Sequence, residues 1–331
     1  MGAMLAGRRD AGATMKGGLR PVEVFALAAV ALIVARGWLV DGVDSPRVQS
    51  WLTVFVSVTM QALPFVALGT LLSAAIGVLV PASFFARALP DQPVLAVPIA
   101  GAAGAVLPGC ECASVPVAGD LVGRGVTPAA ALAFLLSAPA INPVVVASTA
   151  VAFAGRPAMV VARLIASLAT AVLMGWLWLR LGRTDWLRPP ARPETGGRGM
   201  DAFLAAARHD MAQAGGLLAV GAAAAATMNV FVPARWLDVM AGHAVASVLA
   251  LAVLAVLLSI CSEADAFVAA SLTQFSLTAR LAFLVVGPVV DLKLIAMQAG
   301  TFGRRFAMRF APATFVVAVL TAATVGTVLL R

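Results

Sequence analysis

The segment GCECASVP at residues 109–116 decides how this chain is interpreted, because it places two thiols and a carboxylate inside apolar sequence. Cys110, Glu111 and Cys112 are consecutive, and a proline follows at position 116. The whole chain is 62% hydrophobic and only 11% charged, whereas soluble domains are about half apolar and about a quarter charged. The sequence therefore predicts an all-α polytopic membrane protein.

The distribution of basic residues indicates which partners to expect. The formal net charge is +8, but the arginines fall mostly between apolar runs, which is how membrane proteins fix their orientation. No basic patch has interleaved aromatic residues, so nucleic acid is not an expected partner. We expect the lipid bilayer and a small solute as partners, leave a homo-oligomer open, and expect neither a cofactor nor an enzymatic activity.

Several apolar segments are long enough to cross a membrane, for which a helix needs about 20 residues. They are 22–40, 51–79, 129–154, 157–180, 211–232, 279–300 and 310–330. The basic residues before the first segment predict a cytoplasmic N-terminus, and we expect this segment to stay in place as a helix. The predicted location is the cell membrane (inner or plasma), with multiple passes.

Two shorter apolar runs, 94–108 and 244–258, lead directly into cysteine motifs. The first motif is the segment quoted above, and the second is Ser259-Ile260-Cys261-Ser262-Glu263. A helix of this length covers roughly 22 Å, less than the hydrocarbon core. We therefore predict that 94–123 and 244–275 are helical hairpins that enter the membrane and turn back, with full tilted spans as the alternative.

The two halves of the chain align with each other. QALPFVALGTLLSAAIGVLVP at 61–81 aligns with QAGGLLAVGAAAAATMNVFVP at 213–233. Residues 112–139 align with 261–288 without a gap, which pairs Cys112 with Cys261, and the same offset pairs Asn142 with Asp291. The shared order of Gln, Gly, Pro and Cys indicates an internal repeat, although a coincidence of Ala-rich helices is the alternative.

The predicted organisation has four parts. Residues 1–50 form a tail and lead-in helix, 51–180 the first repeat, 181–210 a cytoplasmic linker, and 211–331 the second repeat. Each repeat crosses the membrane an odd number of times, so the repeats are inverted relative to each other. Inverted repeats whose broken helices meet near the midplane are the architecture of secondary transporters.

A longer motif carries a resemblance to a known family. The run GAVLPGCECASVPVAGDLVGRGVTPAAALAFLLSAPAINPVVVAST, together with the later runs CSEADAFVAAS and GPVVDLK, resembles the signature of the ArsP/YraQ-type predicted permeases. The likeness covers roughly residues 50–330. It implies a multi-spanning permease, and the best-known branch of that family is associated with export of trivalent organoarsenicals.

The cysteines are the first candidates for the binding site. Residues two apart on a helix point to different faces, but at a tip broken by Pro108 and Gly109 both Cys110 and Cys112 can turn to one ligand. With Cys261 from the other hairpin they offer three soft sulfur ligands, which suit soft metals and trivalent arsenic. The alternative is that these cysteines are small apolar membrane residues without a task.

Charged and polar residues inside apolar sequence are the second set of candidates, because such groups are costly in a membrane and usually functional. We predict that the solute contacts Cys110, Glu111, Cys112, Cys261, Asn142 and Asp291, and that Glu263, Asp265 and Lys293 couple protons. Lys293 is expected to pair with Asp265 or Glu263. Proline-centred breaks near Asn142 and at Gly287-Pro288 would expose backbone groups for a solute; a buried structural ion pair and simple packing kinks are the alternatives.

These residues support one main hypothesis and two competitors. The main one is a secondary-active permease that exports a thiophilic solute, such as a trivalent organoarsenical or a soft metal, with proton coupling. The first competitor is a transporter of another small solute, with structural cysteines. The second is a membrane thiol–disulfide oxidoreductase, although redox pairs usually have the spacing C-x-x-C.

Overall fold

The computed structural model describes a chain built from helices. The described residues are 46–79, 90, 92–106, 111–187, 200–231, 243–262 and 264–330, and no strand occurs among them. Met1–Gln49 and Ser50–Arg331 form separate compact units. The described part of the first unit is the start of helix α3, and the expected lead-in helix 22–40 lies outside the described residues.

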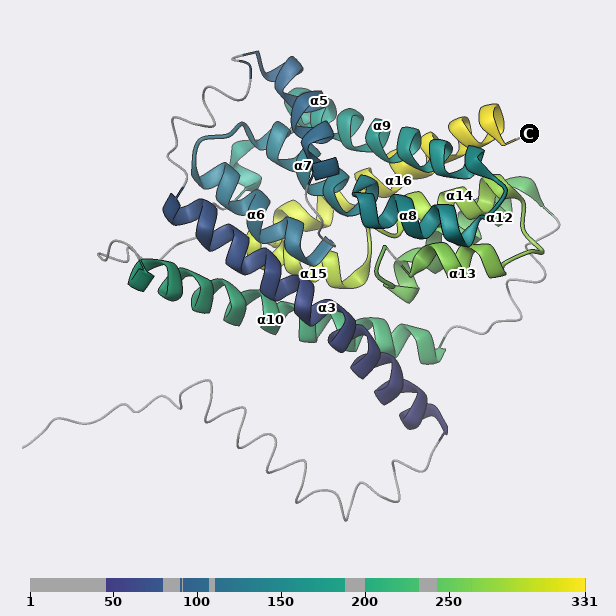
Figure 1. Cartoon of the computed structure of the whole chain (residues 1–331), viewed down its shortest axis with the longest axis horizontal. Coiled ribbons are helices and arrows are strands. Elements are labelled where there is room, and N and C mark those ends of the chain that lie inside the picture. The colour runs from purple at the N-terminus through teal and green to yellow at the C-terminus, as the bar shows by residue number, and fades with distance from the viewer. Residues whose placement is uncertain are drawn as a thin grey trace, which may run out of the picture. The chain divides into compact units, whose positions relative to one another are not determined.

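Figure 1 shows the described helices, labelled in chain order. Their bounds are α3 Pro46–Leu79, α5 Pro93–Ala103, α6 Glu111–Gly123, α7 Pro128–Ile141, α8 Pro143–Ala152, α9 Pro157–Leu181, α10 Met200–Phe231, α12 Ala244–Leu258, α13 Asp265–Ser271, α14 Leu277–Val286, α15 Leu292–Thr301 and α16 Arg304–Leu329, with single 3₁₀ turns at Gly104–Val106 and Thr184–Trp186.

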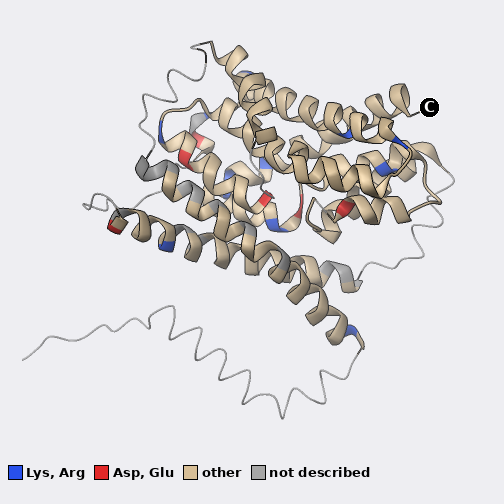
Figure 2. Cartoon of the chain, in the orientation of Figure 1, with Lys and Arg blue, Asp and Glu red and all other residues tan. Residues whose placement is uncertain are grey.

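Four stretches of the described chain are long and apolar enough to cross a membrane. They are Pro46–Leu68, Pro128–Ala152, Pro157–Leu181 and Arg304–Leu329. Charged residues are sparse along the helices (Figure 2), as this reading requires. The prediction of an all-α, multi-pass membrane protein is confirmed.

Two segments predicted as membrane spans are broken helices. Segment 129–154 is α7 and α8, which meet at Asn142, and segment 279–300 is α14 and α15, separated by residues 287–291. Pro143 explains the first break, because a proline lacks the backbone N–H and forces the preceding residue to be extended; Asn142 has φ −67° and ψ 159°. Asp291 is extended at the second break. Both predicted breaks are confirmed.

Helix α10 begins at Met200, although the sequence analysis assigned residues up to 210 to a linker. The polar side chains of Asp201, Arg208 and His209 hid this extension from a search for apolar runs. Asp201 in the first turn suits the positive end of the helix dipole. Residues 188–199 of the predicted linker lie outside the described residues.

Helices α3 and α10 run antiparallel. Trp51 Nε1 donates to Thr227 Oγ1 at 3.0 Å near the start of α3. Thr70 Oγ1 lies 3.8 Å from Met211 Sδ near its other end. Since the numbers rise along one helix as they fall along the other, the two helices pass each other in opposite directions.

Helices α9 and α16 are also antiparallel. The hydroxyls of Thr170 and Thr321 share a buried hydrogen bond of 2.7 Å. Nearer the end of α9, the ring of Trp178 packs edge-on against Phe306, with centroids 5.5 Å apart.

The interior is organised around α7 and α14, which are almost entirely buried. Helices α5, α6 and α9 pack around α7, and α12, α13 and α16 pack around α14. Two further contacts join the halves, because α6 packs on α15 and α13 packs on α8. These two cross-contacts bring together residues that are far apart in the sequence.

Close helix packing depends on glycine at one position next to the site. A Cβ at Gly221 of α10 would overlap the backbone of Lys293 in α15. Small residues at helix interfaces let backbones approach closely in membrane proteins. Gly221 therefore allows α10 to lie directly against the first turn of α15.

Candidate functional site

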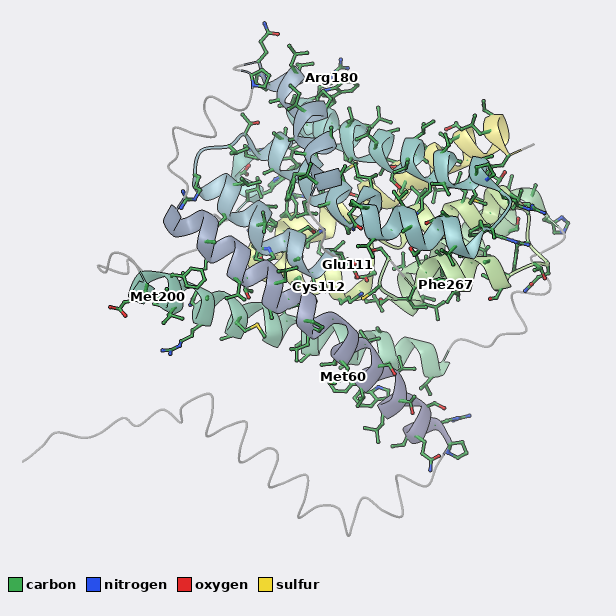
Figure 3. All side chains as sticks on the ribbon, viewed as in Figure 1. Met60, Glu111, Cys112, Arg180, Met200 and Phe267 are labelled. Atoms are coloured by element: carbon green, nitrogen blue, oxygen red, sulfur yellow. The ribbon has the colours of Figure 1, made fainter. Side chains whose placement is uncertain are left out.

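The centre of the site is an ion pair between the two halves. Lys293 Nζ, in the first turn of α15, donates to Glu111 Oε1 at the start of α6. The same ammonium lies 3.3 Å from Asp291 Oδ2. The side chains of Lys293, Glu111 and Asp291 are 0–1% exposed. Figure 3 shows Glu111 in the interior, while labelled residues such as Met60 lie on the outer surface.

Two thiols border this ion pair. Cys261 Sγ lies 3.9 Å from Lys293 Nζ. Cys112 directly follows Glu111 and is labelled beside it in Figure 3. Both cysteines are buried and in no disulfide. The structure thus brings together Glu111, Cys112, Cys261, Asp291 and Lys293, which the sequence analysis proposed as site residues.

Cys110 and Glu263 lie outside the described residues. Within the described part of the chain, no group of three or more His, Cys, Asp or Glu side chains is arranged to hold a metal ion. The cluster of three thiols, which needs Cys110, stays a prediction.

Asn142 and Asp291 perform the same local task in the two halves. Asn142 Oδ1 accepts a hydrogen bond from the backbone N–H of Val145 at 3.0 Å, three residues on. Asp291 Oδ1 accepts from Leu294 N–H at 2.5 Å, also three residues on. Each side chain therefore caps the N-terminus of a half-helix, α8 or α15, and both are 0% exposed.

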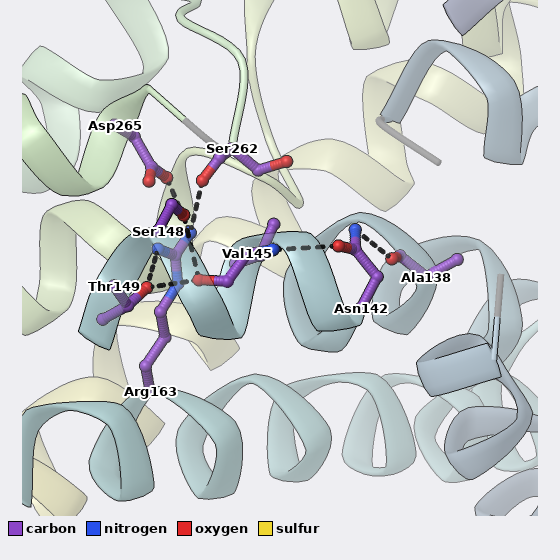
Figure 4. Close-up of polar contacts among 8 residues, drawn as sticks. All are labelled: Ala138, Asn142, Val145, Ser148, Thr149, Arg163, Ser262 and Asp265. Carbon is purple, nitrogen blue, oxygen red and sulfur yellow. Dashed lines mark hydrogen bonds and ion pairs between the residues drawn. The ribbon is translucent and has the colours of Figure 1, made fainter. Parts of the chain in front are cut away.

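The side chain of Asn142 forms a hydrogen bond with a backbone group next to the helix break. Asn142 Nδ2 donates to the carbonyl of Ala138 at 3.1 Å, in the turn that the helix break interrupts (Figure 4). Near the second break, Ser259 Oγ accepts from the N–H of Leu292 at 3.2 Å. These side chains form hydrogen bonds with backbone groups that we expected to bind the solute. A contact between Asn142 and the solute stays a prediction.

A second buried ion pair, which the sequence analysis missed, joins Arg163 of α9 to Asp265 of α13. The Arg163 guanidinium lies 2.9 Å from Asp265 Oδ2, and both side chains are 2% exposed. It also donates to Thr149 Oγ1 at 2.7 Å and to the carbonyl of Ser262 at 3.1 Å (Figure 4). One signal was available: Arg163 is the single charged residue between positions 157 and 179.

The structure contradicts Asp265 as the partner of Lys293, and Glu263 lies outside the described residues. The sequence analysis expected Lys293 to pair with Asp265 or Glu263. Asp265 instead binds Arg163, and Lys293 binds Glu111 from the other half of the chain. The contact of α6 with α15 explains the difference.

Both buried acidic partners stand at the beginning of a helix. Glu111 lies in the first turn of α6, and Asp265 lies in the first turn of α13. The N-terminus of a helix carries a partial positive charge, which favours an acidic side chain there. A cation from another helix then completes each pair, so the partial charges of the half-helices and the side chains stabilise one another.

The central cluster contains one more acidic than basic side chain. With all groups ionised, two carboxylates at Glu111 and Asp291 face the single ammonium of Lys293. Glu111 Oε2 is buried and makes no hydrogen bond within the described residues. Buried charge that is not neutralised is costly, so this cluster favours an additional proton or a positively charged group.

Comparison with known proteins agrees with this picture. The chain matches the family described as predicted permease (ArsP_1) over residues 47–327. It is 34% identical to the UPF0718 protein YcgR of Bacillus subtilis over 278 residues, which are 82% of this chain and 94% of that protein. No solved structure matches.

A second relative comes from Streptococcus mutans and is named as a subunit of a proposed two-component membrane permease complex. It is 30% identical over 284 residues, which are 83% of this chain and 94% of that protein. A family match over most of the chain and two relatives of nearly full length agree with each other. The chain therefore belongs to the predicted-permease family ArsP_1.

Proposed function

We propose that this permease is a secondary-active exporter of a thiophilic small solute, driven by protons. The observation that carries the proposal is the buried Glu111–Lys293 ion pair, with Asp291 and two thiols beside it. Ionisable groups inside a membrane protein usually mark a solute or proton pathway.

The thiols define the class of solute. Cys112 and Cys261 come from different halves, so a solute bound to both senses the movement of one half relative to the other. Soft ligands of this kind favour soft metals, and trivalent arsenic follows the same preference. Each thiol replaces one hydroxyl of a trivalent arsenical and releases one water molecule. An organoarsenical with one As–C bond has two hydroxyls and therefore binds two of the thiols, whereas arsenite has three and can also bind Cys110 in this proposal.

The extra negative charge of the central cluster supports proton coupling. A proton that binds to Glu111 or Asp291 makes the cluster neutral, and its release restores the charge. The unbonded Oε2 of Glu111 offers an acceptor for that proton. In this proposal Lys293 holds the two carboxylates together, while Asp265 and Glu263 provide the onward path.

An inverted repeat accounts for several contacts. Helices α9 and α16 are antiparallel and cross where Thr170 bonds to Thr321. At the offset that aligns Cys112 with Cys261, Thr170 aligns with Val319 and Thr321 with Val172, so the crossing lies almost at equivalent positions. A two-fold axis in the membrane plane produces this arrangement.

The other contacts between the halves support the same symmetry. Helices α3 and α10, which contain residues 61–79 and 213–231 of the aligned segments, are also antiparallel. Helix α6 of the first half packs on α15, and α13 of the second half packs on α8. The equivalents of α6 and α15 are α13 and α8, so one contact becomes the other when the halves are exchanged.

Orientation and domain boundaries belong to the same proposal. We place the N-terminus and the linker after α9 in the cytoplasm, because basic residues concentrate there. Residues 51–180 and 211–331 are the two repeats of a cell-membrane protein, and the hairpins 94–123 and 244–275 enter from opposite sides.

The relative named as a subunit of a two-component complex supports a second component for this chain as well. In that case the chain forms the membrane pathway and a separate protein joins it. Affinity purification of the tagged chain from its native membrane tests this point, with one stoichiometric partner as the expected result and a chain purified alone as the contrary one.

A growth panel tests the solute class. A bacterial host without its own exporters would express the wild type or the Cys110→Ser/Cys112→Ser/Cys261→Ser variant in the presence of trivalent organoarsenicals, arsenite, antimonite, copper or zinc. We expect resistance to one solute, lost in the variant at equal abundance in the membrane. Absence of protection against every solute would exclude the thiophilic class, and protection that survives the cysteine changes would assign the cysteines a structural role.

A further inference from the structure

A basic pocket lies at the start of α16. Its volume is about 500 Å³, and Arg304, Arg305 and Arg309 line it together with Trp186 and Asp185. The three arginines are exposed. Asp185 already pairs with Arg183 at 3.1 Å, so it compensates little of their positive charge. The pocket is therefore suited to an anionic group.

Trp186 gives this pocket the character of a membrane interface. The guanidinium carbon of Arg309 lies 4.4 Å from the centre of the Trp186 ring, which is a cation–π contact. Tryptophan is enriched where the membrane meets water. Arg304 is also the first residue of the membrane-length helix Arg304–Leu329. Both observations place the pocket at the depth of lipid headgroups.

An apolar groove adjoins the basic pocket. Its volume is about 450 Å³, and its walls come from α12, α15 and α16. Met308 lines both the groove and the basic pocket and is 62% exposed. The groove continues along α16 to Phe315 and Val316. The basic pocket and the apolar groove thus meet at Met308.

The basic pocket and the groove together fit one leaflet of a bilayer. The segment from Arg304 to Val316 rises roughly 18 Å as an α-helix. Half of a hydrocarbon core is about 15 Å. A molecule with its charged end at Arg304 and its apolar chain along the groove therefore spans one leaflet.

We propose that these two cavities form one binding site for an anionic phospholipid. Its phosphate lies among Arg304, Arg305 and Arg309, and one acyl chain lies in the groove beyond Met308. Clustered basic side chains next to a membrane helix attract anionic headgroups. The proposal is independent of the solute that the permease carries.

The site has a direct connection to the centre of the protein. Val290 and Ile295 line the groove, and they lie on either side of Asp291 and Lys293 in the sequence. An acyl chain in the groove therefore packs against the segment that holds the central charges. Lipid occupancy stabilises the position of this segment.

Native mass spectrometry of the purified full chain tests the proposal, with phosphatidylglycerol and phosphatidylcholine as probes in the same detergent. We expect phosphatidylglycerol to remain bound more strongly, and Arg304→Gln/Arg305→Gln/Arg309→Gln to lower its affinity about tenfold or more. The matched control, Arg156→Gln/Arg180→Gln/Arg208→Gln, removes the same charge from exposed arginines outside the pocket and should bind like the wild type.

A second pair of variants tests the acyl chain. Met308→Glu places a charge where the pocket meets the groove and should lower phosphatidylglycerol binding, whereas Met200→Glu, at a residue that is 69% exposed, should not. Equal binding of the two lipids, or full binding by the arginine variant, would overturn the proposal. Displacement of the lipid by inorganic phosphate at similar concentrations would show an anion site without a lipid chain and would also overturn it. A photo-crosslinker at Phe315 that captures a protein instead of lipid would have the same consequence.

Discussion

Lys293 and Glu111, which are 182 residues apart in the chain, form a buried ion pair at the contact of α15 with α6. The pair joins the two halves of the protein beside Cys112 and Cys261. Breaking a buried pair is costly because it leaves an uncompensated charge. The pair therefore links the stability of the fold to the charge of the site.

The two members of this pair should respond differently to neutralisation. Lys293→Met leaves Glu111 and Asp291 as two buried like charges, whereas Glu111→Gln leaves Lys293 paired with Asp291. We expect Lys293→Met to destabilise the protein by about 3–5 kcal/mol, and Glu111→Gln to cost clearly less. Thermal unfolding in detergent measures both, and the Glu111→Gln/Lys293→Met double variant should recover part of the loss. Equal losses for the two single variants would contradict the charge balance described here.

Asp291 combines a charge with a helix cap, and two substitutions separate these roles. Asp291→Asn keeps an acceptor for the N–H of Leu294, as Asn142 does for Val145 in the other half. Asp291→Ala removes the cap and should cost about 0.5–2 kcal/mol more than Asn. We expect Asp291→Asn to keep most of the thermal stability and to weaken the dependence of transport on the pH gradient. If Asn and Ala lower the melting temperature equally, capping is not the role of this side chain.

Gly221 offers a test of the close contact between α10 and α15. A Cβ at Gly221 overlaps the backbone of Lys293, whereas a Cβ at Gly216 in the same helix meets no atom within 4 Å. Gly221→Ala should therefore destabilise the protein by about 1–3 kcal/mol. Gly216→Ala should be neutral or slightly stabilising, since alanine favours helices. Similar melting temperatures for the two variants would show that the helices do not pack this closely.

The Arg163–Asp265 pair should anchor α13 to α9. Arg163→Met leaves the buried carboxylate of Asp265 without its guanidinium, and we expect a loss of about 3–5 kcal/mol. The double variant Arg163→Met/Asp265→Asn should recover much of this loss. Arg183→Met is the matched control, because its pair with Asp185 is exposed and such pairs contribute little. The same melting temperatures provide the measurement, and an Arg163→Met variant as stable as the control would remove the anchoring role.

Local features of this fold could be predicted from the sequence. The break at Asn142 follows from Pro143, and the membrane helices follow from hydropathy. The start of α10 could not be predicted in this way, because polar residues such as Arg208 and His209 lower the hydropathy of its first turns. Helix breaks and spans could thus be predicted where residues close in the sequence determine them.

Pairing between distant residues required the packing of the helices. Lys293 was predicted to need a partner, but hydropathy and motif spacing gave no reason to choose Glu111 over Asp265. The contact of α6 with α15 places Glu111 next to Lys293. Arg163 is, like Lys293, a charge inside an apolar run, but its position in the sequence does not identify a partner. Its role became visible only with Asp265 and Thr149 around it.

The most direct test of the proposed function is transport into everted membrane vesicles. The vesicles would contain the wild type or Cys112→Ser/Cys261→Ser, and the measurement would be accumulation of a trivalent organoarsenical with and without an imposed pH gradient. We predict gradient-dependent accumulation by the wild type, and accumulation reduced at least tenfold in the variant at equal abundance. Equal accumulation by both proteins would contradict solute binding at these thiols.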